Sequence, residues 1–240
     1  MQKSGILAKL NGLVSHEAWA SLIGMVYLGL TVNLLLVVSC LPLVALLVTT
    51  DPLYSWPLLA LAVPLAAPGL TAAFRAFREH GTSVRAGGGL GPIRAFVAGL
   101  RETWWRALVI GAMVTAVIVV LLVDVRMLSN TAAAVVTVPL LAVLALLAVA
   151  VGLVSLVAVA EVPTARLRDV LRASLYLGLR RWYLTAVSLA VLAVQIAVFA
   201  TAPALGLGLT ASAALYLAWT NSRVTLRPVL ELDEKATAQA

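Results

Sequence analysis

The stretch that decides the fold is "WYLTAVSLAVLAVQIAVFATAPALGLGLTASAALYLAWTNS", Trp182 to Ser222, which contains no Lys, Arg, Asp or Glu. About 20 apolar residues are enough for a helix to cross the hydrocarbon core of a bilayer, so this run has roughly twice the required length. Its middle, "TAPALGLG" at 201–208, has the proline and glycines that interrupt a helix. The run therefore predicts two membrane-spanning helices joined by a short turn.

The rest of the chain has the same character. Hydrophobic residues make up 62% of the sequence, charged residues only 11%, and the mean hydropathy is +1.06. A soluble fold of this size could not bury so much apolar surface. We therefore expect residues 1–240 to form a single integral membrane domain, an all-α polytopic helical bundle. About six spans are predicted, at 20–41, 55–74, 107–123, 132–160, 183–201 and 205–222.

The distribution of basic residues predicts the orientation of the chain, because basic connections stay on the cytoplasmic side. With both termini cytoplasmic, the cytoplasmic connections are 75–106 and 161–181, and all of the 17 Lys and Arg except Arg126 fall on that side. The pI of 10.2 then follows from membrane topology and from attraction to anionic lipid headgroups. No nucleic acid is needed to explain it.

Both cytoplasmic connections show the period of an amphipathic helix. One lies in 92–108 and runs into the third span, and the other lies in 164–181. The N-terminal segment 6–14 also has one apolar face and predicts a short helix in the membrane interface. We expect these cytoplasmic helices to carry a basic surface that faces lipid or a partner, formed by Arg94, Arg101, Arg106, Arg166, Arg168, Arg172, Arg180 and Arg181.

The glycine-rich stretch "RAGGGLGPIRAF" at 85–96 is predicted to be a linker rather than a phosphate-binding loop. It lacks the Lys followed by Ser or Thr that a loop of the Walker type requires, and no strand precedes it. Its glycines give a flexible connection, and Pro92 suits the first turn of the next helix.

No arrangement of residues indicates catalysis, a cofactor or a metal ion. His16 and His80 lack the spacing of metal ligands, and Cys40 is the only cysteine. The acidic residues next to the spans, Asp51, Asp124 and Glu161, fall at predicted span ends, where a charge can reach water. We therefore expect a protein that is not an enzyme, with no catalytic, cofactor-binding or metal-binding residues.

Two amides inside predicted spans, Asn33 and Gln195, need hydrogen-bond partners in an apolar environment. Bonds between helices are the first interpretation, and a polar cavity is the second. Small residues in the fourth span, Ala145, Ala148, Gly152 and Ser155, predict close contact with another helix.

Several segments, taken in order, resemble the YesL family of bacterial membrane proteins. They are "NLLLVVSCLPL" (33–43), "APGLTAAFRAF" (67–77), "LLVDVRML" (121–128), "EVPTARLRDVLRASLYLGLRRWYLTAV" (161–187) and "NSRVTLRPVLE" (221–231). The insertion of "VALLVTTDPLYSWPLLALAVPL" after the first segment departs from the family pattern and leaves the pairing of the first two spans open. The resemblance implies a multi-pass protein of the bacterial plasma membrane with a role near carbohydrate uptake.

Two functions remain open at this point, beside a third, a small membrane enzyme, which would need a polar pocket for which the composition leaves little room. The first is a non-enzymatic inner-membrane protein that is accessory to an ABC-type carbohydrate importer and contacts its permease or ATPase subunits. The second is a self-contained carrier or channel for a small solute, built around Asn33 and Gln195.

Overall fold

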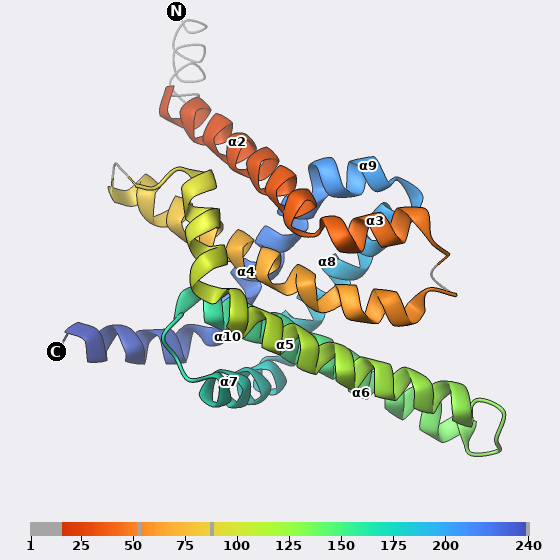
Figure 1. Cartoon of the computed structure of the whole chain (residues 1–240). Helices are drawn as coiled ribbons and strands as arrows, with labels where there is room; N and C mark the ends of the chain where they lie inside the picture. The colour runs from red at the N-terminus through yellow and green to blue at the C-terminus, as the bar shows by residue number, and fades with distance from the viewer. Residues whose placement is uncertain (1–15, 52–53, 87–88, 239–240) are drawn as a thin grey trace, which may run out of the picture.

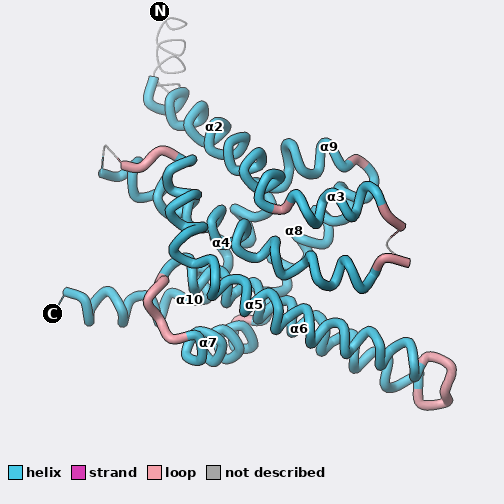
Figure 2. The backbone as a smooth tube through the Cα atoms, viewed as in Figure 1, coloured by secondary structure: helices cyan, strands magenta, loops and turns pink. Residues whose placement is uncertain are grey.

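A computed structural model describes residues 16–51, 54–86 and 89–238, and in this part of the chain there are helices and turns but no strand (Figures 1 and 2). The predicted all-α membrane bundle is confirmed. The expected interfacial helix at 6–14 lies outside the described residues. The elements are α2 (His16–Ser39), α3 (Leu41–Thr49), α4 (Trp56–Ala86), α5 (Pro92–Leu128), α6 (Ala134–Glu161), α7 (Leu167–Arg180), α8 (Trp182–Thr201), α9 (Pro203–Leu205), the π-helix η1 (Gly206–Thr210) and α10 (Ala211–Ala238).

Five of these helices, α2, α4, α5, α6 and α8, are long and apolar enough to cross a membrane. They correspond to the first five expected spans. The sixth, 205–222, is divided between the end of α9, η1 and the first half of α10. α10 falls short as an apolar helix of its own because it carries Arg223, Arg227 and Glu231 from its thirteenth residue onward.

The helix lengths match the thickness of a bilayer. In α5, Arg106 and Asp124 are 18 positions apart, which is about 27 Å at 1.5 Å per residue, close to the ~30 Å of a hydrocarbon core. α8 has 20 residues and a length of about 30 Å. The charged ends of the helices can therefore lie in two planes, with the apolar middle between them.

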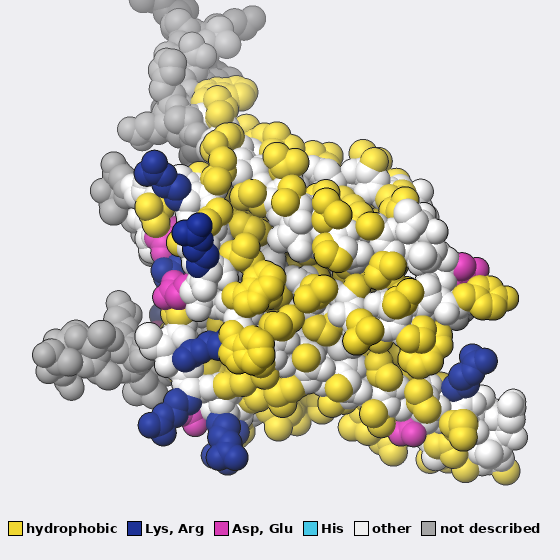
Figure 3. Space-filling model, viewed as in Figure 1, with side chains coloured by type: hydrophobic (Ala, Val, Ile, Leu, Met, Phe, Trp, Pro, Cys, Tyr) yellow, Lys and Arg dark blue, Asp and Glu magenta, His cyan; other side chains and the backbone are white. Residues whose placement is uncertain are grey.

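Basic residues gather at one end of the bundle, which we call the basic end: the second half of α4, the first half of α5, α7 with its flanking residues, and α10 from Arg223 onward. The start of α2 and the end of α6 lie at the same end. Figure 1 shows the start of α2, the α4–α5 connection and the end of α10 on the same side of the molecule. Figure 3 shows Lys and Arg on this side in that view and hydrophobic side chains across the middle. Arg126, in the last turn of α5, lies at the opposite end.

Two connections are more helical than expected. α4 continues to Ala86 and α5 begins at Pro92, so the expected linker at 85–96 is reduced to a few residues between two helices. Beyond Ser39, the expected outer loop contains the nine-residue helix α3, which packs against α4. Pro42 lies in the first turn of α3, where a missing backbone N–H does no harm.

The core lies where α4, α5 and α6 pack together towards the basic end. Phe74 of α4, Ile110 of α5 and Val157 of α6 are fully buried. Gly152 of α6 allows this approach, because a Cβ added there would lie 2.8 Å from Cγ2 of Val114 on α5. In lipid no hydrophobic force drives helices together, so close packing at small residues stabilises the contact instead. Large apolar side chains cover the outer faces, as expected for helices whose solvent is lipid.

Candidate functional site

A polar cluster closes the basic end of the bundle around Glu161, the last residue of α6. Its carboxylate is 5% exposed and forms an ion pair with Arg223, with 3.2 Å between Oε1 and Nε. The same Oε1 accepts a hydrogen bond of 3.0 Å from the indole Nε1 of Trp219. The Arg223 guanidinium also lies over the Trp219 ring, 5.0 Å from its centroid. Both partners belong to α10, so this carboxylate joins α6 to α10.

Two arginines from earlier helices bind the backbone carbonyls that follow. Arg78 of α4 donates to the carbonyls of Ala160 and Glu161. Arg106 of α5 donates to the carbonyls of Pro163 and Ala165, the latter at 2.8 Å. The last carbonyls of a helix have no partner within the helix and carry partial negative charge, so cationic donors stabilise them. The end of α6 is therefore fixed by α4, α5 and α10 together.

Sequence reasoning missed this cluster. It expected Glu161 to reach water at a span end, but the carboxylate is enclosed by α10. It also assigned Arg106 to a free basic surface, and the structure shows its guanidinium in use on the 163–165 carbonyls. A usable signal was the position of Trp219 and Arg223, four residues apart on one face of the last apolar segment, where an aromatic and a cation could both face a carboxylate.

The remaining residues of the expected basic surface lie mainly on the outside. Arg181 is a second exception, since it donates to the carbonyl of Val224 in α10. The side chains that are exposed are those of Arg94, Arg101, Arg166, Arg168, Arg172 and Arg180. Four of these six belong to α7 or its N-cap, so the accessible positive charge is concentrated there.

α7 has two different faces. Val170, Ser174 and Leu177 are buried, against α6 and α10. On the outward face, Leu175, Tyr176 and Leu179 are 46%, 65% and 51% exposed, in addition to the exposed Arg168 and Arg172. α7 is therefore an amphipathic helix that is packed on one side, and its outward side combines cations with leucine and tyrosine.

The two amides come together around η1. Asn33 is 1% exposed; its Nδ2 donates to the Gly208 carbonyl at 3.0 Å, and its Oδ1 accepts from the Ser212 backbone N–H at 2.7 Å. Gly208 and Ser212 are four residues apart and would bond each other in an uninterrupted α-helix. The Asn33 amide therefore takes the place of this backbone hydrogen bond. A side chain that inserts between helical hydrogen-bond partners in this way distorts the helix locally.

Gln195 holds the same turn from α8. Its Nε2 donates to the Gly206 carbonyl at 2.7 Å, and its Oε1 accepts from the Thr210 hydroxyl at 2.8 Å. Gln195 is half-buried, less enclosed than Asn33. Both amides therefore make bonds between helices, the first of the two interpretations that the sequence left open.

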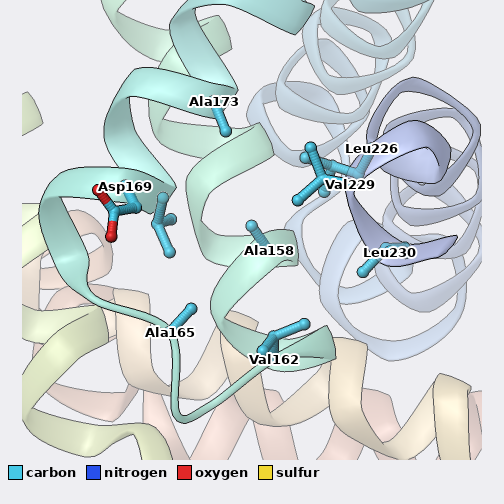
Figure 4. A pocket seen from close by; sticks show the side chains of 9 residues that line it. Ala158, Val162, Ala165, Asp169, Ala173, Leu226, Val229 and Leu230 are labelled. Atoms are coloured by element: carbon cyan, nitrogen blue, oxygen red, sulfur yellow. The ribbon is translucent and has the colours of Figure 1, made fainter. Parts of the chain in front are cut away.

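A shallow groove runs between α6, α7 and α10 at the basic end (Figure 4), with a volume of about 190 Å³. Its lining is Ala158, Val162, Ala165, Asp169, Val170, Ala173, Leu226, Val229 and Leu230. Asp169, in the first turn of α7, is the only charged residue of this lining.

The chain matches no family model, no curated protein and no solved structure.

Proposed function

We propose that this protein is a non-enzymatic, multi-pass protein of the bacterial plasma membrane that is accessory to an ABC-type carbohydrate importer. The proposal takes its transport context from the resemblance of segments such as 33–43 and 161–187 to the YesL family. The single structural observation that carries it is the outward face of α7, which lies at the basic end and offers both cations and apolar side chains.

The composition of this face suits a partner in the membrane interface. Arg168 and Arg172 can pair with lipid phosphates or with acidic side chains of a permease or ATPase subunit. Leu175, Tyr176 and Leu179 can enter a groove on the same partner. Amphipathic helices commonly bind partners in this way. The buried face of α7 holds the helix against α6, so that the outward face is presented in a fixed position.

Photo-crosslinking in cells tests the partner. A photoreactive residue at Tyr176 should capture permease or ATPase subunits of a carbohydrate importer, and the charge reversals Arg168→Glu and Arg172→Glu should reduce the yield. The matched control is Val120 of α5, which is 59% exposed but lies away from the basic end. Equal products from both positions, or capture of none of these subunits from Tyr176, would reject the proposed partner.

We place the basic end and both termini on the cytoplasmic side, because basic connections stay on that side. In a Cys40→Ala background, Thr82→Cys at the basic end should resist a membrane-impermeant maleimide in intact cells. Asn130→Cys, in the α5–α6 connection, should react. The reverse pattern would overturn the orientation.

The alternative function, a self-contained carrier or channel for a small solute, is favoured by one observation. π-helical turns frequently occur at functional sites, and η1 is held by the two membrane-embedded amides. In reconstituted vesicles, a carrier would move a solute, and Asn33→Leu would abolish this flux. Against this function, the four amide hydrogen bonds already engage the backbone and Thr210, which leaves little capacity for a solute.

A further inference from the structure

The first part of α5 lies outside the apolar layer of the membrane. α5 has 37 residues and a length of about 55 Å, which exceeds the ~30 Å of a hydrocarbon core. Its membrane part begins after Arg106, which binds the carbonyls of Pro163 and Ala165 at the basic end. Figure 1 shows that the first turns of α5 run across the direction of the rest of the helix. Residues 92–105 therefore lie along the surface of the apolar layer, at the level of the lipid headgroups.

Residues 92–105 have a buried side and an apolar side. The buried side packs against α4, where a Cβ added to Gly99 would lie 2.8 Å from the Cβ of Arg75. The apolar side carries Ile93 and Trp104, whose side chains are exposed. Because this segment is held against α4 and lies next to the apolar layer, exposed apolar groups on it can enter the acyl chains of the lipids.

The third side of this segment is cationic. Arg94, Arg101 and Trp105 are exposed and lie on one helical face, at positions i, i+7 and i+11. Within the described residues, neither arginine takes part in an ion pair. Glu102, the only acidic residue of 92–105, pairs with Arg75 of α4, with 3.3 Å between Oε2 and Nη1. The exposed charge of this face is therefore positive and is not balanced within the segment.

A hollow at the start of α5 gives room for a headgroup. It lies between α2 and α5, has a volume of about 330 Å³ and is lined by Tyr27 and residues 91–94. Arg94 brings a guanidinium to this lining and Tyr27 brings a phenolic hydroxyl, and both groups can donate hydrogen bonds to phosphate oxygens. Ile93 adds apolar surface to the same hollow.

A row of cations beside an apolar side, at the level of the headgroups, is complementary to an anionic phospholipid. We propose that residues 92–105 form a lipid anchor that binds anionic phospholipids. Ile93 and Trp104 enter the acyl region, and Arg94 and Arg101 donate to phosphate oxygens. Arginine forms two parallel hydrogen bonds with phosphate, and tryptophan is enriched at the membrane interface. The anchor continues directly into the membrane part of α5, so lipid of the adjoining leaflet is its immediate neighbour.

Native mass spectrometry of the purified full chain tests the anchor, with equimolar phosphatidylglycerol and phosphatidylcholine offered in detergent. We expect the anionic glycerol lipid to be retained in preference to the choline lipid. Arg101→Gln should lower this preference about fivefold, the equivalent of about 1 kcal/mol. The matched control is Arg126→Gln, the same change at the opposite end of α5, which should lower it clearly less because the nearby Asp124 offsets the charge.

The position of the lipid is tested by crosslinking in cells. A photoreactive residue at Ala98, which is exposed on the same face between Arg94 and Arg101, should form lipid adducts. Protein adducts at this position would assign the face to a partner and reject the anchor. Equal effects of Arg101→Gln and Arg126→Gln, or equal retention of the two lipids, would reject it as well. The partner proposed for α7 is tested from Tyr176, on a different helix, so the anchor can fail while that proposal stands.

Discussion

The replacement of Asn33 by leucine tests how η1 is held. Leucine branches at Cγ as asparagine does and suits a membrane helix, so the change removes the hydrogen bonds while keeping the side-chain shape, although leucine is the larger of the two and adds some crowding. Two are lost: the bond to the Gly208 carbonyl and the bond from the Ser212 N–H. Hydrogen bonds between membrane helices average about 0.6 kcal/mol and reach about 1.7 kcal/mol. For two such bonds at a site that is 1% exposed, we expect the free energy of unfolding to fall by about 1–2 kcal/mol.

Two measurements check this expectation. The first is the unfolding free energy in detergent, compared with that of Leu34→Ala, a neighbouring substitution on the exposed side of α2 that should have a small effect. The second is hydrogen exchange of the Ser212 amide, which should become faster when its acceptor is gone. If Asn33→Leu is as stable as the parent and exchange at Ser212 is slow, the Ser212 N–H has formed a direct hydrogen bond to the Gly208 carbonyl. The amide would then not be what holds the turn.

Three further tests, two of them with a matched control, probe packing and polar contacts, each measured as unfolding free energy in detergent. Glu161→Ala removes the acceptor of the buried Trp219 indole and should lower the unfolding free energy by about 1–3 kcal/mol. Glu161→Gln keeps an acceptor and should lower it clearly less. Equal losses would contradict the role of Glu161 as the acceptor for this indole. Gly152→Val should lower the unfolding free energy by about 1–3 kcal/mol, because the added side chain overpacks the contact with α5. The control is Gly208→Ala, whose added Cβ meets no neighbouring atom. Ser174→Ala should raise stability by about 0.5 kcal/mol, because the buried hydroxyl has no partner in the described structure and alanine favours helix; a loss above that size would reveal a hydrogen bond through water.

Hydropathy and charge were sufficient to predict the bundle and most helix positions. The runs 107–123 and 132–160 became the membrane parts of α5 and α6 because their length alone requires a helix in lipid. The helix α3 was missed for a physical reason: a short apolar stretch without a period is equally compatible with a loop and a helix. The amphipathic period in 164–181 located α7, since one face had to be buried.

Which arginines bind backbone carbonyls and which are exposed could not be predicted from the sequence. Position along a helix places Arg94 and Arg106 at the same end of the bundle, and both look like exposed cations. Which of them meets a carbonyl depends on how α5 is rotated against α6, and that rotation is set by contacts such as Gly152 with Val114. Likewise, the sequence indicated that Asn33 needed partners, but the partners are backbone atoms of a distorted turn that no side-chain pattern reveals.

The arginines that donate hydrogen bonds to the carbonyls of 160–165 also have a consequence for the order in which the helices can pack during synthesis. Arg78 and Arg106 emerge from the ribosome before α6 does, so the hairpin of α4 and α5 can act as a template that receives the end of α6 as soon as it is inserted. Glu161 can meet Arg223 and Trp219 only after α10, which follows later in the chain, has been inserted. In that order of synthesis, α10 can dock against a carboxylate that α4, α5 and α6 already hold at this end of the bundle.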